Sequence, residues 1–295
     1  MAEDPMALVD SHLHLQDPVF APDFPEVLDR ARRSGVKIMV CNATSEKDWD
    51  RVRELAEQVP EIVPCFGIHP WYLRNRKDGW EHRLRSLLEA TPSALGEAGL
   101  DRWYEDRYET EQELVFREQL TVARDLRRPV MVHCLKAWGW LMRVLEDVGE
   151  LPAGFLLHAY GGPAELIGPL SEKGAYFSFA GNVLDERKLR MRRSLQAVPA
   201  DRLLLETDSP DLPPPDMYRV PARAGHEGRY RNEPANLTAI LTAVAPLREQ
   251  TPEQLAAMVL ENACQLLGSV PGLDLTPLRS GGPPCSTTDL SASGS

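Results

Sequence analysis

Close to its N-terminus, the chain places three side chains that bind protons and metals at alternate positions. Residues 10–14 read DSHLH, so one residue separates Asp10 from His12 and another separates His12 from His14. The surrounding run, MALVDSHLHL, has the apolar character of a buried strand, and side chains two positions apart on a strand point to the same side. We therefore expect the three polar groups to face one interior space, where two histidines can hold a divalent ion.

Histidines and carboxylates also end other strand-like runs. His69, His133 and His158 close three apolar runs, while Glu97 and Asp208 close two more. Any one of these histidines, taken alone, could be a core residue bonded to a backbone carbonyl. Independent core histidines would not all choose strand ends, however, so their joint placement favours a set of ligands.

The candidate ligands outnumber the positions around one tetrahedral ion. They are His12, His14, Glu97, His133, His158 and Asp208. Such a set suits two ions bridged by a shared carboxylate and a water. A pair of divalent ions lowers the pKa of that water and stabilises the oxygens of a displacement reaction, which predicts a metal-dependent hydrolase.

The elements that must position these residues alternate regularly. Strand-like runs occupy residues 7–14, 36–43, 62–69, 93–100, 129–134, 154–160, 174–180 and 202–208. Between them, apolar residues recur at the three- and four-residue steps of a helix packed on one face, as at 46–59, 111–126 and 137–148. Eight strands alternating with helices predict an α/β fold of the TIM (β/α)₈ type, in which the strand ends meet at one catalytic face. A doubly wound open sheet is the alternative, and the strand count favours the barrel.

The predicted domain is a single barrel over residues 1–268, closed and capped by helical runs at 232–247 and 251–268. The tail at 269–295 is rich in Gly, Ser and Pro and has no periodicity. We expect this tail to be disordered.

Composition limits the class of protein and its partners. The hydrophobic content of 43% and the charged content of 26% are typical of soluble globular proteins. No run approaches the roughly 18 to 20 apolar residues that cross a bilayer, and no secretory signal opens the chain, so we expect a cytoplasmic protein. The five cysteines form no CxxC pair and are expected to be structural thiols. The net charge of −11 disfavours a long duplex footprint and favours a strand end or a short substrate.

The sequence resembles the TatD family of metal-dependent hydrolases over about residues 8–268. The matching segments, in the family's order, are DSHLHL (10–15), FGIHP (66–70), GEAGLD (96–101), VMVHC (130–134), HAYGG (158–162), ETDSP (206–210), RNEPANL (231–237) and ENA (261–263). Neighbouring amidohydrolase classes share the HxH motif but bridge their metals with a carboxylated lysine on the fourth strand. Here that strand carries Glu97 and no lysine.

The resemblance implies a TIM barrel and a role for each matched ligand. His12, His14 and Asp208 match the ligands of one metal, and His133 and His158 match those of the second. Glu97 matches the carboxylate that bridges the two metals. Asp208 would also accept the proton of a hydroxide-forming water held between the ions.

Other matched positions imply substrate and supporting roles. His69 matches a histidine suited to bonding a phosphate oxygen, and Asp10 and Glu206 are expected to orient imidazoles or to cap the barrel. Family members often carry Ser or Cys and then Arg after the fifth-strand histidine, whereas this chain reads HCLKAW, so Lys136 is the expected basic substitute. The sixth-strand segment is often HCFSG and is HAYGG here. These departures affect the expected substrate preference and leave the ligands intact.

The predicted substrate contacts are His69, Lys136 and Arg231, from a wider group of loop arginines interleaved with aromatic residues that can stack on bases. The arginines are Arg74, Arg76, Arg102, Arg107, Arg219, Arg223, Arg229 and Arg231. The aromatic residues are Trp71, Tyr72, Trp103, Tyr104 and Trp138. Each of them, taken singly, could instead be a solvated or packing residue.

The function predicted from these features is a phosphodiesterase, specifically a 3′-5′ exodeoxyribonuclease that uses two divalent ions. Imidazole ligands favour zinc, iron or manganese, whereas phosphate-bearing substrates commonly bring magnesium, so Mg²⁺, Mn²⁺ and Zn²⁺ all stay open. One alternative is a TatD-like hydrolase of another bond, such as an aminoacyl-tRNA ester or a small phosphoester. A non-catalytic barrel scaffold is the other, and it predicts a damaged ligand set, whereas all six positions are intact. The sequence indicates no oligomeric state.

Overall fold

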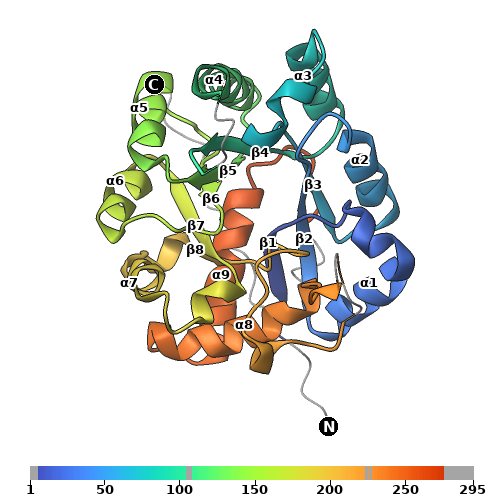
Figure 1. Cartoon of the computed structure of the whole chain (residues 1–295), viewed down its shortest axis with the longest axis vertical. Coiled ribbons are helices and arrows are strands. Elements are labelled where there is room, and N and C mark those ends of the chain that lie inside the picture. The colour runs from blue at the N-terminus through green and yellow to red at the C-terminus, as the bar shows by residue number, and fades with distance from the viewer. Residues whose placement is uncertain (1–5, 104–107, 223–224, 226–227, 276–295) are drawn as a thin grey trace, which may run out of the picture.

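Eight parallel strands form one sheet in which each strand pairs with the next along the chain (Figure 1). The computed structural model describes residues 6–103, 108–222, 225 and 228–275. The strands are β1 (Leu8–Leu13), β2 (Val36–Asn42), β3 (Ile62–Phe66), β4 (Ala94–Asp101), β5 (Val130–Leu135), β6 (Phe155–Leu157), β7 (Ala175–Phe179) and β8 (Leu203–Leu205).

The first and last strands meet and turn the sheet into a barrel. The Ser11 hydroxyl donates to the carbonyl of Leu205 at 2.9 Å, and the amide of Asp208 donates to the carbonyl of His12 at 3.0 Å. The amide of His14 in turn donates to the carbonyl of Ser209 at 2.8 Å. The predicted TIM barrel is therefore confirmed.

Helices surround the strands, as the three- and four-residue apolar periodicity predicts (Figure 1). They are α1 (Phe24–Arg33), α2 (Trp49–Gln58), α3 (Trp80–Ala90), α4 (Glu109–Asp125), α5 (Trp138–Val148), α6 (Ile167–Glu172), α7 (Leu189–Ala197), α8 (Leu237–Val244) and α9 (Pro252–Leu267). Their buried apolar side chains form one core layer with the outward side chains of the strands. A second cluster fills the barrel interior and includes Ala263 and Leu267 of α9, so this last helix packs against the interior core, as predicted.

A capping box fixes the start of α9. The Thr251 hydroxyl accepts from the amide of Gln254 at 3.3 Å, and the Gln254 side chain accepts from the amide of Thr251 at 3.0 Å. Within the described chain, no helix is long and apolar enough to cross a membrane.

The ordered chain extends beyond the predicted domain boundary at residue 268. Val270 is buried in the interior cluster, against which Leu273 and Leu275 also pack. These apolar side chains add residues 269–275 to the core, which favours a domain that ends later than the predicted residue 268. The rest of the predicted tail lies outside the described residues.

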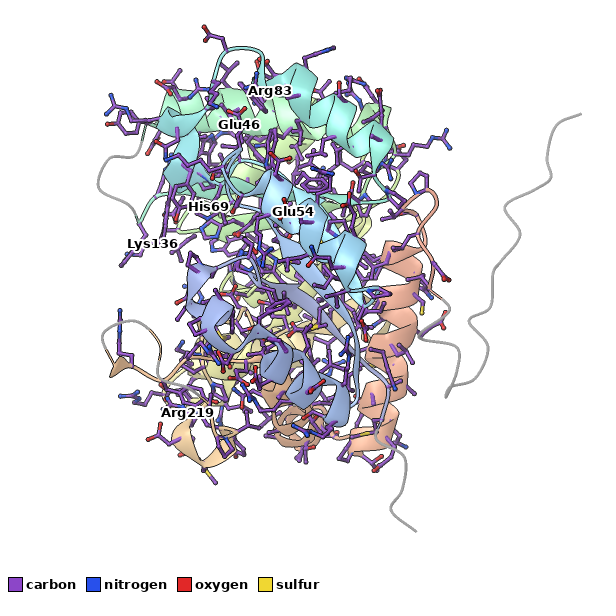
Figure 2. The ribbon with its side chains drawn as sticks, turned by 90° about the vertical axis from the view of Figure 1, so that its right-hand side faces the viewer. Glu46, Glu54, His69, Arg83, Lys136 and Arg219 are labelled. Atoms are coloured by element: carbon purple, nitrogen blue, oxygen red, sulfur yellow. The ribbon has the colours of Figure 1, made fainter. Side chains whose placement is uncertain are left out.

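Several predicted strands end early, so that site residues lie on the loops just after them. The strands predicted at 62–69, 154–160 and 202–208 end at Phe66, Leu157 and Leu205. At Ala159 and Asp208 the backbone has φ of 43° and 54°, a left-handed conformation that a strand does not continue through. His69, Lys136 and Arg219 follow β3, β5 and β8 in the chain, and all three lie toward one side of the molecule (Figure 2).

Candidate metal centre

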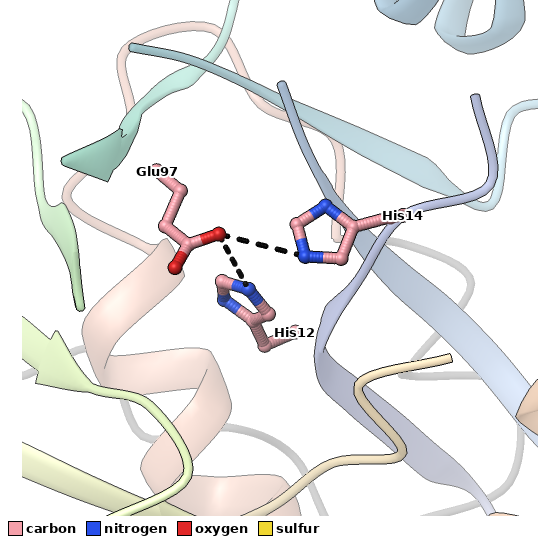
Figure 3. A group of neighbouring side chains, drawn as sticks. All are labelled: His12, His14 and Glu97. Carbon is pink, nitrogen blue, oxygen red and sulfur yellow. Dashed lines mark ion pairs between the residues drawn. The ribbon is translucent and has the colours of Figure 1, made fainter. Parts of the chain in front are cut away.

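Glu97 lies at the centre of the polar cluster, at the carboxyl-terminal side of the barrel. Its side chain is buried, and its Oε2 atom is 3.5 Å from Nε2 of His12 and 3.5 Å from Nε2 of His14 (Figure 3). Asp208 completes this group, since its Oδ1 atom is 3.8 Å from Nε2 of His12 and 3.5 Å from Nε2 of His14.

The other oxygen of Glu97 faces a second group of imidazoles. Oε1 is 2.9 Å from Nε2 of His158, 3.1 Å from Nδ1 of His133 and 3.4 Å from Nε2 of His69. Nδ1 of His133 and Nε2 of His158 are themselves 3.2 Å apart. One carboxylate thus offers each of its oxygens to a separate set of ring nitrogens.

These separations fit metal coordination. An ion about 2.0–2.1 Å from two tetrahedral ligands holds those ligands about 3.4 Å apart. The separations of 3.5–3.8 Å from Oε2 of Glu97 and Oδ1 of Asp208 to the Nε2 atoms of His12 and His14 match that spacing. The groups His12–His14–Glu97 and His69–Glu97–His133 each bring their ligand atoms within 4.8 Å of one another.

Hydrogen bonds outside the cluster leave the inward nitrogens as acceptors. Nδ1 of His14 donates to the carbonyl of Asn42 at 2.8 Å, which leaves the Nε2 lone pair facing the carboxylates. Nε2 of His133 donates to Oδ2 of Asp101 at 2.9 Å, which leaves the Nδ1 lone pair facing Glu97. Neither ring nitrogen of the buried His12 has a hydrogen-bond partner among the described residues. Lone pairs converging on carboxylate oxygens require a cation between them, so these residues fit bound metal ions.

The pKa shifts report the same requirement. Burial alone would lower the pKa of His14, but the hydrogen bond to Asp208 and the charge of Glu97 raise it to about 9. Burial would raise the pKa of Glu97, yet the surrounding imidazoles hold it well below its usual range. Burial and the neighbouring His158 lower the pKa of His12 to about 4. Against the effect of burial, the carboxylates also raise the pKa values of His133 and His158, so without metal the cluster gathers protons that bound cations would replace.

His69 differs from the other imidazoles in its hydrogen bonding. Its Nδ1 accepts from the amide of Trp71 at 3.1 Å, so the neutral ring carries its proton on Nε2. Burial lowers the pKa of His69 to about 3, which keeps the ring neutral at ordinary pH. A neutral ring with an Nε2–H group is a hydrogen-bond donor, and this favours the predicted contact with a phosphate oxygen over metal ligation.

Asp101 is a site residue that sequence reasoning missed. Its Oδ2 accepts from His133 at 2.9 Å and from the indole nitrogen of Trp71 at 2.8 Å, and its Oδ1 accepts from the amide of Trp103 at 2.5 Å. Gln112 clamps the backbone of Asp101 through two hydrogen bonds of 2.7 and 2.8 Å. The available signal was its position four residues after Glu97 on β4, because residues at i and i+4 of a strand share a face.

Comparison with known proteins assigns this geometry to a family. The sequence profile of the family described as TatD related DNase matches residues 9–268. The chain belongs to this family. The 3′-5′ ssDNA/RNA exonuclease TatD of Cronobacter sakazakii is 34% identical over 261 residues, which cover 88% of this chain and 97% of that protein. The protein of the same name from Salmonella typhimurium is 32% identical over 260 residues, which cover 87% and 97%.

A solved structure agrees with this assignment. YJJV, a TatD homologue from Escherichia coli K12, superposes with a TM-score of 0.80 at 27% identity, covering 88% of this chain and 97% of that one. The prediction of a TatD-type metal-dependent hydrolase is therefore confirmed, and the buried His, Glu and Asp groups supply sites able to hold metal ions.

The two carboxylates expected to support the TatD ligands have different partners. Oε1 of Glu206 is 3.6 Å from Nδ1 of His158 and accepts from the amide of Ala159 at 2.8 Å, so Glu206 can orient that imidazole. Asp10 contacts no imidazole in the described structure. It accepts from the amide and hydroxyl of Thr207 at 2.8 and 2.6 Å, and burial raises its pKa well above the usual range. Asp10 thus joins β1 to the segment after β8.

The cluster of candidate metal ligands opens into a hollow of about 390 Å³ with an aromatic edge. Trp71 and Tyr72 line this hollow and are 39% and 38% exposed. Trp103 is 57% exposed, and its ring lies 6.2 Å from that of Trp71. Trp138 instead packs on Tyr160 with ring centroids 4.8 Å apart. Tyr104 lies outside the described residues.

Most of the candidate arginines have protein partners. Arg231 is 1% exposed, and its guanidinium donates to Asp23 at 2.6 and 2.8 Å and to Glu233 at 2.7 Å. These contacts favour a structural role over the predicted substrate contact. Arg76 and Arg102 pair with Glu111 and Glu109, and Arg74 stacks on Tyr108. Arg107 and Arg223 lie outside the described residues. Lys136 is exposed on the loop after β5 (Figure 2).

Proposed function

We propose that the protein is a two-metal 3′-5′ exonuclease that acts on single-stranded nucleic-acid ends, DNA foremost. The observation that carries the proposal is the buried Glu97 carboxylate, whose two oxygens face separate imidazole groups. Because a carboxylate in this arrangement can bridge two ions, the geometry supports two sites. His12, His14 and Asp208 would hold one ion, and His133 and His158 the other.

The residues of the chain supply the positioning and the proton transfers. When bound, two divalent ions supply an activated water and neutralise charge that develops on phosphate oxygens. Asp208 lies at the edge of the hollow, within 3.8 Å of both first-strand imidazoles, and can accept a proton there. His69 carries its proton on Nε2 and can donate to a non-bridging phosphate oxygen.

The substrate class follows from the edge of the hollow and from the named relatives. The exposed rings of Trp71, Tyr72 and Trp103 offer stacking surfaces for unpaired bases, which a duplex does not present. Two relatives are named 3′-5′ ssDNA/RNA exonuclease, so RNA ends belong in the substrate test beside DNA. We also propose a cytoplasmic location, because Cys41, Cys65 and Cys134 are buried thiols, as suits a reducing compartment.

The deciding experiment is hydrolysis of 5′-labelled single-stranded DNA with Mg²⁺, Mn²⁺ or Zn²⁺ supplied in turn. The wild type should shorten the strand stepwise from its 3′ end. Glu97→Gln should lower kcat by on the order of 10³-fold, since it removes the anion shared by both sites. The matched control is Glu54→Gln on α2, an exposed carboxylate that pairs with Arg51 and lies outside the predicted ligand set.

Two results would redirect the proposal. A metal-loaded wild type that leaves DNA and RNA intact but hydrolyses aminoacyl-tRNA esters or small phosphoesters would support the alternative TatD-like hydrolase. Equal rates for wild type and Glu97→Gln would show that the cleavage comes from another site or from a contaminant.

A further inference from the structure

The hollow above the metal centre does not stand alone. Its wall includes Pro210 and Asp211, which also line a neighbouring hollow of about 430 Å³. That second hollow shares Pro213 and Arg219 with a third one of about 940 Å³ beside α7. Because they share lining residues, the three hollows adjoin one another and form a series, here called the depression, that starts at the metal centre and follows the loop after β8. We call the second and third hollows together the side groove.

Charge is distributed unevenly along this depression. No Lys or Arg is among the described residues that line the hollow above the metal centre, whereas Asp17, Asp48 and Asp211 are. The side groove contains the basic groups: Arg219 and Arg229 line its nearer part, and Arg187 and Lys188 its farther part. A polyanionic strand that leaves the metal ions therefore first meets cationic side chains in the side groove.

The farther part of the groove lies against an unusually basic segment. Residues 187–193 read RKLRMRR, with five basic residues in seven, in a chain whose net charge is −11. Asp185, Glu186 and Asp216 also line this part, and Asp185 pairs with Arg187 at 2.8 Å. The Arg187 side chain is nevertheless 89% exposed, so it can turn from Asp185 to a phosphate without unpacking anything.

The groove also offers faces for bases. Tyr230 lines the nearer part and Tyr218 the farther part. The Arg219 guanidinium covers one face of the Tyr230 ring at 4.7 Å and pairs with Asp216 at 2.6 Å, so a base would stack on the remaining faces. Met217 stands 81% exposed beside Tyr218. Cationic groups that follow a backbone, with aromatic faces between them, are the features of sequence-tolerant single-strand binding.

We propose that the side groove binds the single-stranded nucleic acid upstream of its 3′ end, while that end occupies the metal centre. This inference rests on the proposed nuclease function and deepens it, because it assigns a path to the part of the substrate that is not being cut. It makes affinity depend on strand length, through contacts that do not involve the metal ligands.

The test is a binding measurement, which does not depend on cleavage. Fluorescence anisotropy is recorded with 5′-labelled oligothymidylates from about 4 to about 16 nucleotides, the usual range of single-strand sites. Their last linkages carry phosphorothioates that resist hydrolysis. Two variants are compared with wild type. One carries Arg187→Glu, and the other carries both Arg187→Ser and Lys188→Ser. The matched control is Arg143→Glu, an exposed arginine of α5 that lines a hollow sharing no residue with the depression.

Wild type should bind the longest strand about 10-fold more tightly than the shortest one, and Arg187→Glu should abolish most of that gain. The slope of log affinity against log salt should fall by about 0.7 for each phosphate that the variant no longer neutralises. Arg143→Glu should behave as wild type. Equal length dependence in wild type and Arg187→Glu, or an equal loss in Arg143→Glu, would overturn the inference. Length-dependent binding of the protected strands, together with no hydrolysis of unmodified strands of the same length, would uphold the groove and count against the nuclease activity.

Discussion

Replacing Asp101 with Asn tests whether a carboxylate outside the predicted ligand set controls metal binding through its hydrogen bond to His133. In the wild type, Asp101 accepts three hydrogen bonds, from His133, Trp71 and the amide of Trp103, at 2.9, 2.8 and 2.5 Å. Asparagine keeps the shape but replaces one acceptor oxygen by an NH₂ donor. Whichever way the amide turns, a donor then faces at least one donor in a fully buried position.

The size of the effect follows from that mismatch. A buried polar group left unsatisfied costs about 1–3 kcal/mol, which is about 5- to 150-fold in an equilibrium constant. If His133 escapes the mismatch by shifting its proton to Nδ1, the nitrogen that faces Glu97 is no longer a ligand. Removing the hydrogen-bond partner of a metal-bound histidine typically lowers metal affinity by about 10- to 100-fold, which agrees with the first estimate.

The assay is calorimetric titration of apo protein with Mn²⁺ or Zn²⁺, with hydrolysis followed in parallel. Asp101→Asn should weaken one binding step by about 10- to 100-fold and leave the other nearly unchanged. Asp125→Asn is the control, since Asp125 is an exposed carboxylate that pairs with Arg85 at 2.8 Å and with Arg124 at 3.8 Å. Wild-type affinity at both steps in Asp101→Asn would refute the claim that this carboxylate orients His133.

Three further predictions concern metal content, substrate stacking and stability. His14→Ala and His133→Ala should each lower the metal content of the protein by about one ion per chain, measured by elemental analysis. Removal of all metal should lower Tm by several degrees, because saturating ions contribute about 3 kcal/mol to the free energy of unfolding. Trp103→Ala should raise KM for single strands by about 10-fold, as the loss of 1–3 kcal/mol of stacking implies, and Trp103→Tyr should recover most of it. Arg231→Met should lower the free energy of unfolding in urea by about 3 kcal/mol at pH 7, with KM unchanged if its role is structural. Hydrogen bonds from Arg231 hold the pKa of Asp23 below its usual range. The stability that the Arg231–Asp23 pair contributes is therefore complete above about pH 4 and is lost as the pH falls through the folded-state pKa of Asp23. An equal loss of stability in Arg231→Met at low pH would contradict an origin in this ion pair.

The fold was predictable because its signals are local and repeated. Each strand carries its own apolar run and each long helix its own amphipathic period, so eight independent signals point to the same architecture. The end of the domain was harder to place. The segment SVPGLDL at 269–275 has no helical or strand periodicity, and only the three-dimensional core shows that Val270 is buried.

The central cluster was predictable for a similar reason, whereas the residues that support it were not. A histidine at the end of an apolar strand is conspicuous in a sequence, because a buried polar side chain must have a hydrogen-bond partner or a metal ion. Asp101 and Gln112 stand in ordinary polar surroundings, and only the fold shows that they hold His133. Arg231 shows the same limit from the other side: in the sequence a loop arginine resembles a phosphate contact, whereas in the fold Asp23 and Glu233 lie against its guanidinium and favour a structural role.

The charge of the cluster gives a further reason for two ions. Four carboxylates face its imidazoles: Glu97, Asp101, Glu206 and Asp208. Neutral imidazoles are required for ligation and cancel none of that charge. One divalent ion would leave the buried cluster with an excess of negative charge that then had to be met by protons, as the raised pKa of His14 illustrates. Two divalent ions, as proposed above, would balance these four carboxylates, and Asp17, Asp48 and Asp211 then remain as negative groups in the hollow. Because the described lining of the hollow contains no Lys or Arg, the proposed ions would be the cations that meet an incoming phosphate there, and basic side chains line the groove farther along.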